Sequence, residues 1–137
     1  MEIKEILENA TMIAVVGCST DPAKDAHNIP LYLQKQGYTI IPVNPNCSEV
    51  LGEKCYPDVQ SIPEDFNIDV VDIFRRPEAT AGVIEDVIKR VKKTKHKPII
   101  WTQLGVSSDE AKRLAEEADI EYVENRCMKI EYNRFLG

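Results

Sequence analysis

The sequence predicts an α/β fold in which helices cover both faces of a parallel sheet. Short, strongly apolar runs alternate along the chain with amphipathic stretches, which is the pattern of successive βαβ units. The right-handed crossover rule leaves few topologies for such a chain. We therefore expect a three-layer Rossmann-like fold with a five-stranded parallel sheet, built as one domain from residues 1–137.

The five expected strands are apolar runs, rich in β-branched residues, that end at polar residues. After the third strand, the apolar residues recur at helical spacing from Ala81 to Val91, which predicts a long helix. The expected strands are Met12–Val16, Tyr38–Val43, Val70–Phe74, Pro98–Trp101 and Glu121–Val123.

Helices are expected before, between and after these strands. Gly37 is a typical helix stop, Pro30 is placed in the first turn of its helix, and Ser107 or Ser108 suits a helix N-cap. The segment Asn46–Pro63 contains Pro, Gly and Asp and is expected to be irregular. The expected helices are Glu2–Asn9, a helix that starts near Ala26–Asn28 and runs to Gln36, Glu78–Lys92, a helix ending at Ala118, and a terminal helix or turn at Cys127–Phe135.

The composition excludes several function classes. With 17 basic and 23 acidic residues, the net charge of −6 argues against a nucleic-acid or anionic membrane partner. The N-terminal residues lack the apolar core of a signal peptide, and no apolar run approaches the roughly 20 residues that span a bilayer. The sequence predicts a cytoplasmic protein.

The four cysteines are Cys18, Cys47, Cys55 and Cys127, and they form no CxxC motif. With only two histidines to supplement them, no zinc site is expected. Cys47 and Cys55 lie in one loop region and could form a disulfide in a disulfide-tolerant thermophile, whereas free thiols are the default in a reducing cytosol.

The stretch Met12–Asn46 reads as a strand, a glycine turn, a helix and a second strand. Such a turn, followed by a helix N-terminus, suits an anionic phosphate. A dinucleotide fingerprint would have glycine at three positions, but Gly17 is followed by Ser19 and Pro22. The second strand also lacks an acidic residue at its end for a ribose. The turn therefore favours a phosphate ligand and argues against NAD.

All five strand ends carry polar, cationic or aromatic groups. Because the carboxyl ends of parallel strands meet at one edge, these groups predict a binding cleft there. The competing interpretations are structural: Gly17 as a tight turn, Lys24 as a solvated charge, Arg75 and Arg76 paired with acids, and Trp101 in the core. No catalytic constellation, metal cluster or P-loop is present, so the chain reads as a binding protein rather than an enzyme.

Taken together, the strand-end motifs resemble those of the small stand-alone CoA-binding proteins, which are similar to the N-terminal domain of the succinyl-CoA synthetase α-subunit. The resemblance extends from about Leu7 to Arg134. The motifs are VVGCSTDPAKDAHNIPLYLQKQGYTIIPVNP, LGEKCYPDVQSIP, VDIFRRPE, WTQLG and ENRCMKIEYNR.

The resemblance implies coenzyme A as the ligand and assigns a part of the site to each motif. The first turn and helix start should hold the phosphates, through Gly17, Cys18, Ser19, Thr20, Lys24, His27 and Asn28. The second strand end should flank the adenosine, through Val43, Asn44 and Pro45, and the third should cover the ligand, through Phe74, Arg75 and Arg76. The fourth should line the cleft, through Trp101, Gln103 and Gly105, and the last should lie nearest the pantetheine thiol, through Asn125, Arg126 and Cys127.

Three functions remain open at this point. The leading one is a non-catalytic carrier, sensor or regulatory module for CoA or acyl-CoA, because the phosphohistidine domain and nucleotide-binding subunit of the synthetase have no counterpart in these residues. The second is a CoA-site subunit of a multi-chain acyl-CoA enzyme. The third is a thiol module in which Cys18 or Cys127 forms a mixed disulfide with CoA. Whether the chain forms a homo-oligomer or works with a partner protein is left open.

Overall fold

The computed structural model describes all residues from Met1 to Gly137, and its centre is a five-stranded parallel sheet. The strand order is β2-β1-β5-β6-β7, so the predicted α/β Rossmann-like fold is confirmed. The strands are β1 (Met12–Val16), β2 (Thr39–Val43), β5 (Val70–Ile73), β6 (Ile99–Thr102) and β7 (Tyr122–Val123).

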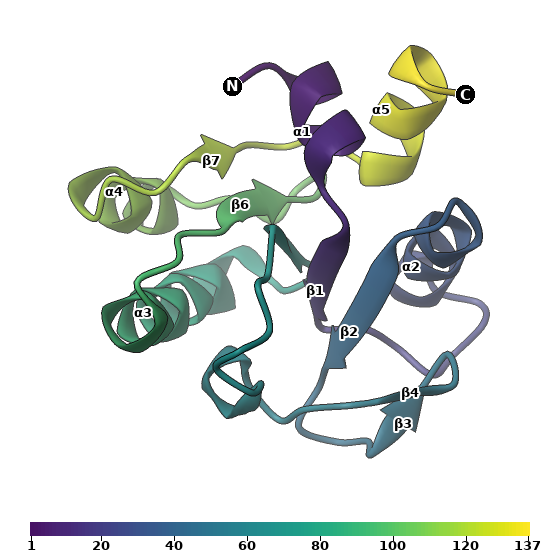
Figure 1. Ribbon diagram of the computed structural model, residues 1–137, viewed down its shortest axis with the longest axis horizontal. Helices are drawn as coiled ribbons and strands as arrows, with labels where there is room; N and C mark the ends of the chain where they lie inside the picture. Colours follow the sequence, from purple (N-terminus) through teal and green to yellow (C-terminus); the bar gives the residue numbers. More distant parts are fainter.

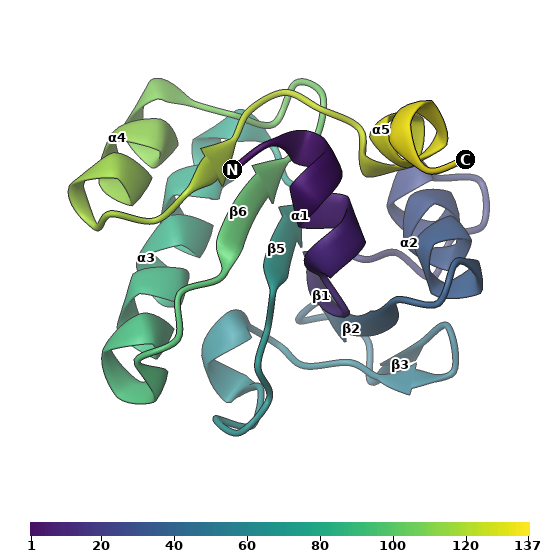
Figure 2. The same ribbon diagram turned by 45° about the horizontal axis from the view of Figure 1, so that its top comes forward.

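Helices cover both faces of the sheet (Figure 1). One layer contains α3 and α4, and the other contains α1, α2 and α5, with α1 and α5 in contact (Figure 2). The helices are α1 (Ile3–Asn9), α2 (Asp25–Lys35), α3 (Pro77–Thr94), α4 (Asp109–Glu117) and α5 (Met128–Phe135). None of them combines the length and apolarity that crossing a membrane requires.

The alternation of side chains along each strand builds two cores. In β1, Ile13 and Val15 face the core shared with α1, α2 and α5, while Ala14 and Val16 face the core shared with α3 and α4. Strands buried on both faces need continuous apolar runs, which is why these strands are so easily read from the sequence.

The order of connections places a switch point beside β1. The chain passes from β1 to β2 on one side and then crosses to β5 on the other, so that Val16 pairs with Val43 and with Ile73. In open sheets of this kind, ligands bind outside the carboxyl ends of the strands at such a point.

The segment expected to be irregular contains a small hairpin, β3 (Glu49–Val50) and β4 (Glu53–Lys54), and a 3₁₀ turn at Val59–Ser61. Leu51 and Gly52 connect the two strands with φ values of 56° and 76°. A two-residue turn with both φ values positive is the usual hairpin connection, but it is normally signalled by Asn-Gly or Asp-Gly. Leucine at the first position hid the hairpin from sequence analysis.

Beside this segment, Arg90 of α3 is 5% exposed and donates hydrogen bonds to backbone carbonyls only. Its guanidinium reaches the four carbonyls of Val59, Ile62, Pro63 and Phe66 at 2.5–3.2 Å. The single planar guanidinium of Arg90 therefore holds the loop that leads into β5 in place.

We expect Arg90→Lys to destabilise the protein by about 2–3 kcal/mol, because an ammonium group cannot reach all four carbonyls and leaves buried acceptors unpaired. Urea unfolding monitored by circular dichroism measures this cost. Arg113→Lys on exposed α4 is the matched control and should change stability by no more than about 0.5 kcal/mol. Equal stability of the two variants would contradict the fastening role of Arg90.

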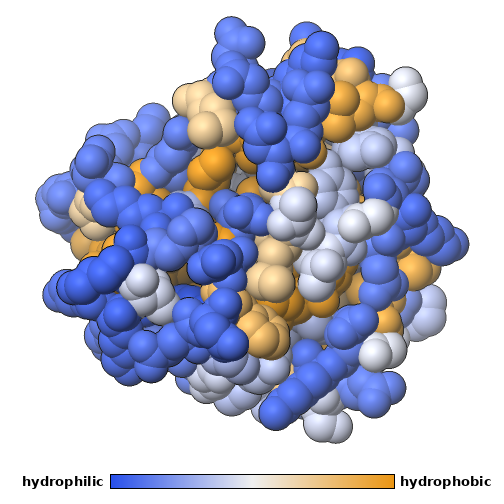
Figure 3. Space-filling model, in the orientation of Figure 1, coloured by the Kyte–Doolittle hydropathy of each residue, from blue (hydrophilic) through white to orange (hydrophobic).

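Few large apolar side chains are exposed. In the face shown in Figure 3, hydrophobic areas are small and separated by hydrophilic side chains. The exposed large hydrophobic residues are Met1, Leu104, Ile130 and Phe135.

Candidate functional site

The two strands at the switch point approach each other closely at their carboxyl ends. Gly17 has φ +88°, and a Cβ on it would lie 2.1 Å from the carbonyl oxygen of Phe74. Its N–H donates to Val43 O at 2.8 Å, and Phe74 N–H donates to Val16 O at 2.8 Å. The first residue after β1 is therefore fixed between both neighbouring strands, and only glycine fits there.

The turn after Gly17 is tied to α2 through a bond that Pro30 makes available. Pro30 lies in the second turn of α2, not in the first as the sequence suggested. Since proline has no N–H, the carbonyl of Ala26 lacks its usual helical partner and instead accepts the N–H of Ser19 at 3.0 Å. This bond holds the turn against the start of the helix.

Several N–H groups of the turn remain free for a ligand. Neither the Cys18 nor the Thr20 N–H donates to a protein acceptor. At the start of α2 the N–H groups of Asp25 and Ala26 are also unpaired, whereas the His27 N–H donates to Lys24 O at 3.0 Å. Such groups suit an anion. Lys24 is exposed beside them, although the exposed carboxylate of Asp25 in the first turn partly offsets this charge.

Two predicted ligand residues brace this turn. Asn28 Nδ2 donates to Pro22 O at 2.8 Å, and His27 Nδ1 lies 2.7 Å from Ser19 O. Because a carbonyl can only accept, Nδ1 of His27 carries the hydrogen. His27 can therefore donate to a phosphate through Nε2 only as an imidazolium.

The end of β2 is bound to the same turn. Asn44 Nδ2 donates to Cys18 O at 2.9 Å, and Asn44 Oδ1 accepts the N–H of Asn46. Val43 is buried, whereas Pro45 is exposed at the rim. Of this predicted group, Pro45 and the half-buried Asn44 offer surface to a ligand.

Arg75 and Arg76 follow β5 directly, next to the Gly17 turn. Arg75 is half-buried and Arg76 is exposed, and neither side chain forms an ion pair or hydrogen bond within the protein. All other arginines of the chain are paired: Arg90 with carbonyls, and Arg113, Arg126 and Arg134 with glutamates. The alternative that these two arginines pair with nearby acids is not what the structure shows. Phe74, which precedes them, is half-buried against the core.

Trp101 and Gln103 differ from the expectation that they line the cleft. Trp101 is 0% exposed and donates from Nε1 to Arg126 O at 2.8 Å, so its indole is a core side chain. Gln103 is 5% exposed, and its Nε2 donates to Asp72 Oδ1 at 2.6 Å. Sequence analysis overlooked Asp72, a carboxyl group within an otherwise apolar strand, and therefore left Gln103 without a protein partner.

Asp72 is 0% exposed, and its Oδ2 has no hydrogen-bond partner. Burial raises the pKa of the Asp72 carboxyl to about 7, and the hydrogen bond from Gln103 opposes this shift only in part. A carboxyl group with a pKa near neutral pH is thus buried beneath the carboxyl edge of the sheet.

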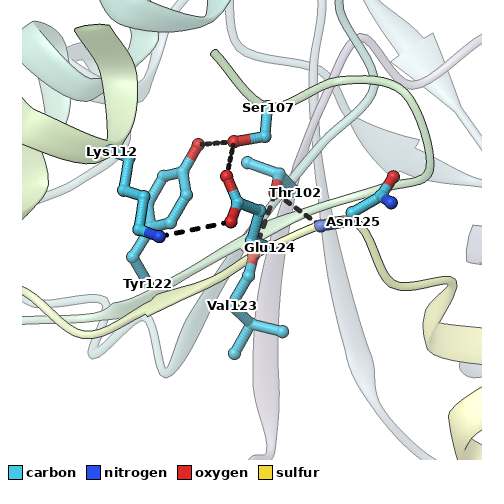
Figure 4. A network of polar contacts seen from close by, with 7 residues as sticks. All are labelled: Thr102, Ser107, Lys112, Tyr122, Val123, Glu124 and Asn125. Atoms are coloured by element: carbon cyan, nitrogen blue, oxygen red, sulfur yellow. Dashed lines mark hydrogen bonds and ion pairs between the residues drawn. The ribbon is translucent and has the colours of Figure 1, made fainter. Parts of the chain in front are cut away.

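A polar network shapes the far part of the edge, after β6 and β7 (Figure 4). Asn125, with φ 58°, accepts the Gly105 N–H through Oδ1 at 2.8 Å. Ser107 Oγ donates to Glu124 Oε2 at 2.7 Å, and this bond, together with Lys112 at 3.4 Å, holds the pKa of Glu124 below its usual range. Asn125 therefore fixes the loop that presents Gly105. Glu124 was predicted as part of this strand end and Ser107 as a candidate helix cap, but neither was predicted as a ligand residue.

The last predicted group is partly engaged with α5. Arg126 lies 3.4 Å from Glu131, and Cys127 is buried at the start of the helix. Cys18 is 0% exposed, and burial raises the pKa of its thiol to about 12. A buried, protonated thiol is a poor nucleophile, so this position does not favour a mixed disulfide at Cys18.

No group of three or more His, Cys, Asp or Glu side chains is arranged to hold a metal ion. A hollow also lies at the opposite, amino-terminal edge of the sheet, and its lining includes Ile6, Asp69, His96 and Asp119. No sequence motif points to it, and the predicted residues that remain accessible all lie at the carboxyl edge.

The fold and this edge define a doubly wound α/β domain whose switch point combines a glycine turn with two unpaired arginines. Comparison with protein-family models gives a match to the CoA binding domain over residues 11–133. The chain therefore belongs to the CoA-binding domain family.

The relatives are of two kinds. The uncharacterized protein YneT of Bacillus subtilis is 37% identical over 129 residues, which cover 94% of this chain and 90% of the relative. The ADP-forming acetate–CoA ligase II of Archaeoglobus fulgidus is 33% identical over 81 residues, which cover 56% of this chain but 12% of the ligase.

The solved structures show the same division. A hypothetical protein from Pyrococcus horikoshii is 43% identical with a TM-score of 0.90, and the alignment covers 98% of this chain and 90% of that protein. The dinucleotide-forming acetyl-coenzyme A synthetase 1 of Ca. Korarchaeum cryptofilum is 28% identical with a TM-score of 0.70, over 88% of this chain and 27% of the synthetase. The domain thus occurs alone and within larger enzymes.

Proposed function

We propose that this chain binds coenzyme A at the carboxyl edge of the sheet and acts as a non-catalytic carrier, sensor or regulatory module. The observation that carries the proposal is the pair of unpartnered arginines, Arg75 and Arg76, beside the Gly17 turn at the switch point. On a chain of net charge −6, an anionic ligand needs such a local concentration of cations and N–H donors.

The proposed arrangement of CoA follows the accessible donors. The phosphates lie against the free N–H groups of Cys18 and Thr20, with Arg75 and Arg76 opposite. Asn44 and Pro45 flank the adenosine. The pantetheine arm extends along the edge towards Gly105 and Asn125, which line a shallow hollow.

Calorimetric titration tests this function. We expect CoA to bind with micromolar or tighter affinity, and NAD and ATP to bind more weakly. Dephospho-CoA, which lacks the 3′-phosphate, shows how much of the affinity that phosphate supplies. Equal affinities for CoA and NAD would overturn the proposal.

Arg75→Ala and Arg76→Ala should each weaken CoA binding by about tenfold to 100-fold, because charge-assisted hydrogen bonds are worth about 1.5–3 kcal/mol. Arg113→Ala on α4 is the matched control: it removes one arginine that pairs with Glu117 and lies outside the proposed site. An equal loss of affinity in all three variants would indicate a general charge effect instead of a site at β5.

A second candidate, a CoA-site subunit of a multi-chain acyl-CoA enzyme, is favoured by the similarity to parts of an acetate–CoA ligase and an acetyl-coenzyme A synthetase. It predicts co-purification with an ATP-grasp-like chain and acyl-CoA turnover by the mixture. Absence of turnover with any such chain would leave the binding module as the function.

A further inference from the structure

The structure places two cysteines of the hairpin segment side by side. Cys47 precedes β3 and Cys55 follows β4, and their Sγ atoms are 3.6 Å apart. A disulfide bond is about 2.0 Å long, so the two sulfur atoms are already close to bonding distance. Both residues flank the small hairpin and lie outside the helices and the main sheet.

The two thiols differ in access and in surroundings. Cys47 is half-exposed, whereas Cys55 is 6% exposed and lies 3.5 Å from the carbonyl of Asn44. Burial raises the pKa of the Cys55 thiol to about 11, and the contact with Cys47 adds to this shift. An accessible thiol next to a buried one suits an attacking and a resolving cysteine.

We propose that Cys47 and Cys55 form a dithiol–disulfide exchange site for low-molecular-weight disulfides. The Cys47 thiolate attacks one sulfur of the small disulfide, breaks its S–S bond, and releases one small thiol, which takes up a proton. Cys55, which is held in contact with Cys47, then attacks Cys47 Sγ and gives its proton to the departing second small thiol. Two protein thiols are oxidised, and one external disulfide is reduced to two thiols.

This dithiol site does not require bound CoA, and it is separate from a mixed disulfide at Cys18 or Cys127. Both of those residues are buried, and neither of their sulfur atoms forms a hydrogen bond with another sulfur, as Cys47 and Cys55 do. Exchange at the hairpin would, in addition, fix the segment that follows Asn44, since Asn44 is bonded to both Cys55 and the carbonyl of Cys18.

Incubation of the reduced full-length protein with oxidised glutathione tests the proposal. We expect the free thiols to fall from 4 to two, the mass to fall by two hydrogens, and peptide mapping to find a Cys47–Cys55 crosslink that reductant removes. A parallel incubation with CoA disulfide shows whether the small thiol matters. An intact count of free thiols, or a crosslink involving another cysteine, would overturn the proposal.

Single variants test the order of attack. Cys55→Ser should accumulate one glutathione on Cys47, because no resolving thiol remains, whereas Cys47→Ser should stay unmodified at buried Cys55. The Cys18→Ser and Cys127→Ser double variant is the control and should form the crosslink as the wild type does. Faster modification of Cys55 than of Cys47 would contradict the assigned roles. Mapping of the crosslink in the wild-type protein tests the proposal even if a variant fails to fold.

Discussion

Gly17→Ala is expected to destabilise the protein by about 4 kcal/mol or more, the largest single effect that the structure predicts for a one-carbon change. The added Cβ would lie 2.1 Å from Phe74 O, and alanine disfavours the observed φ of +88°. Neither strand can yield easily, since Gly17 N–H and Phe74 N–H are both engaged in bonds between strands. Urea unfolding followed by circular dichroism measures the loss.

Gly37→Ala is the matched control for this variant. Gly37 has φ +105°, but a Cβ there meets nothing within 4 Å. It should therefore show only the backbone cost of a positive φ, about 1 kcal/mol. If the two variants are equally stable, the close approach of β1 and β5 does not constrain Gly17.

A loss of CoA binding in the Gly17→Ala variant would have two explanations. Glycine at a strand–helix turn is usually explained by the approach of a phosphate to the backbone. Here the carbonyl of Phe74 already excludes a side chain at Gly17 without any ligand. Loss of CoA binding in Gly17→Ala would thus follow from misfolding as readily as from a lost phosphate contact, whereas Arg75→Ala and Arg76→Ala remove side chains that hold nothing else in the protein.

The five strands of the main sheet could be predicted because each is a continuous apolar run, and the helices because their apolar residues recur at helical spacing. Their carboxyl ends could also be placed on one edge, since parallel strands allow no other arrangement. The role of Pro30 could not be predicted, because it depends on where the Ala26 carbonyl points after the turn has folded. Likewise, nothing local indicates that Leu51 adopts a positive φ.

Within the candidate site, sequence reasoning gave residue types but not their tertiary partners. Arg75 and Arg76 could be named because they follow a strand, yet their lack of acidic partners is a property of the folded chain. Gln103 was expected to contact a ligand because its partner Asp72 is 31 residues away. Pairing across strands decided which polar side chains face the cleft.

Asp72→Asn is expected to remove a pH dependence from the stability of the protein. The folded protein holds a proton on Asp72 up to a pKa of about 7, whereas the ordinary value for an aspartate is 3.8. Between these values the folded state binds a proton that the unfolded state releases, so this group makes the free energy of unfolding fall as pH rises from about 4 to 7. Above pH 7 the buried carboxylate is charged, and the decrease is complete.

Asparagine reproduces the protonated carboxyl, since its Oδ1 can still accept from Gln103 and its Nδ2 replaces the O–H group. The variant should match the wild type near pH 4 and exceed it above pH 7, by at most about 4 kcal/mol for a difference of about three pKa units. Urea unfolding of both proteins from pH 4 to 9 gives the difference at each pH. Asp65→Asn, at an exposed aspartate, is the control for the loss of one carboxylate.

A constant difference between Asp72→Asn and the wild type over this range would mean that water or movement of the chain relieves the buried charge. A difference that grows with pH would instead establish that the Gln103 amide donates its hydrogen bond to a protonated Asp72 carboxyl in the core. In that case Asp72→Asn should leave CoA affinity unchanged, because Asp72 and Gln103 are both buried, whereas Arg75 is half-buried and Arg76 is exposed. Stability and binding would then be governed by separate groups within a few residues of the same strand.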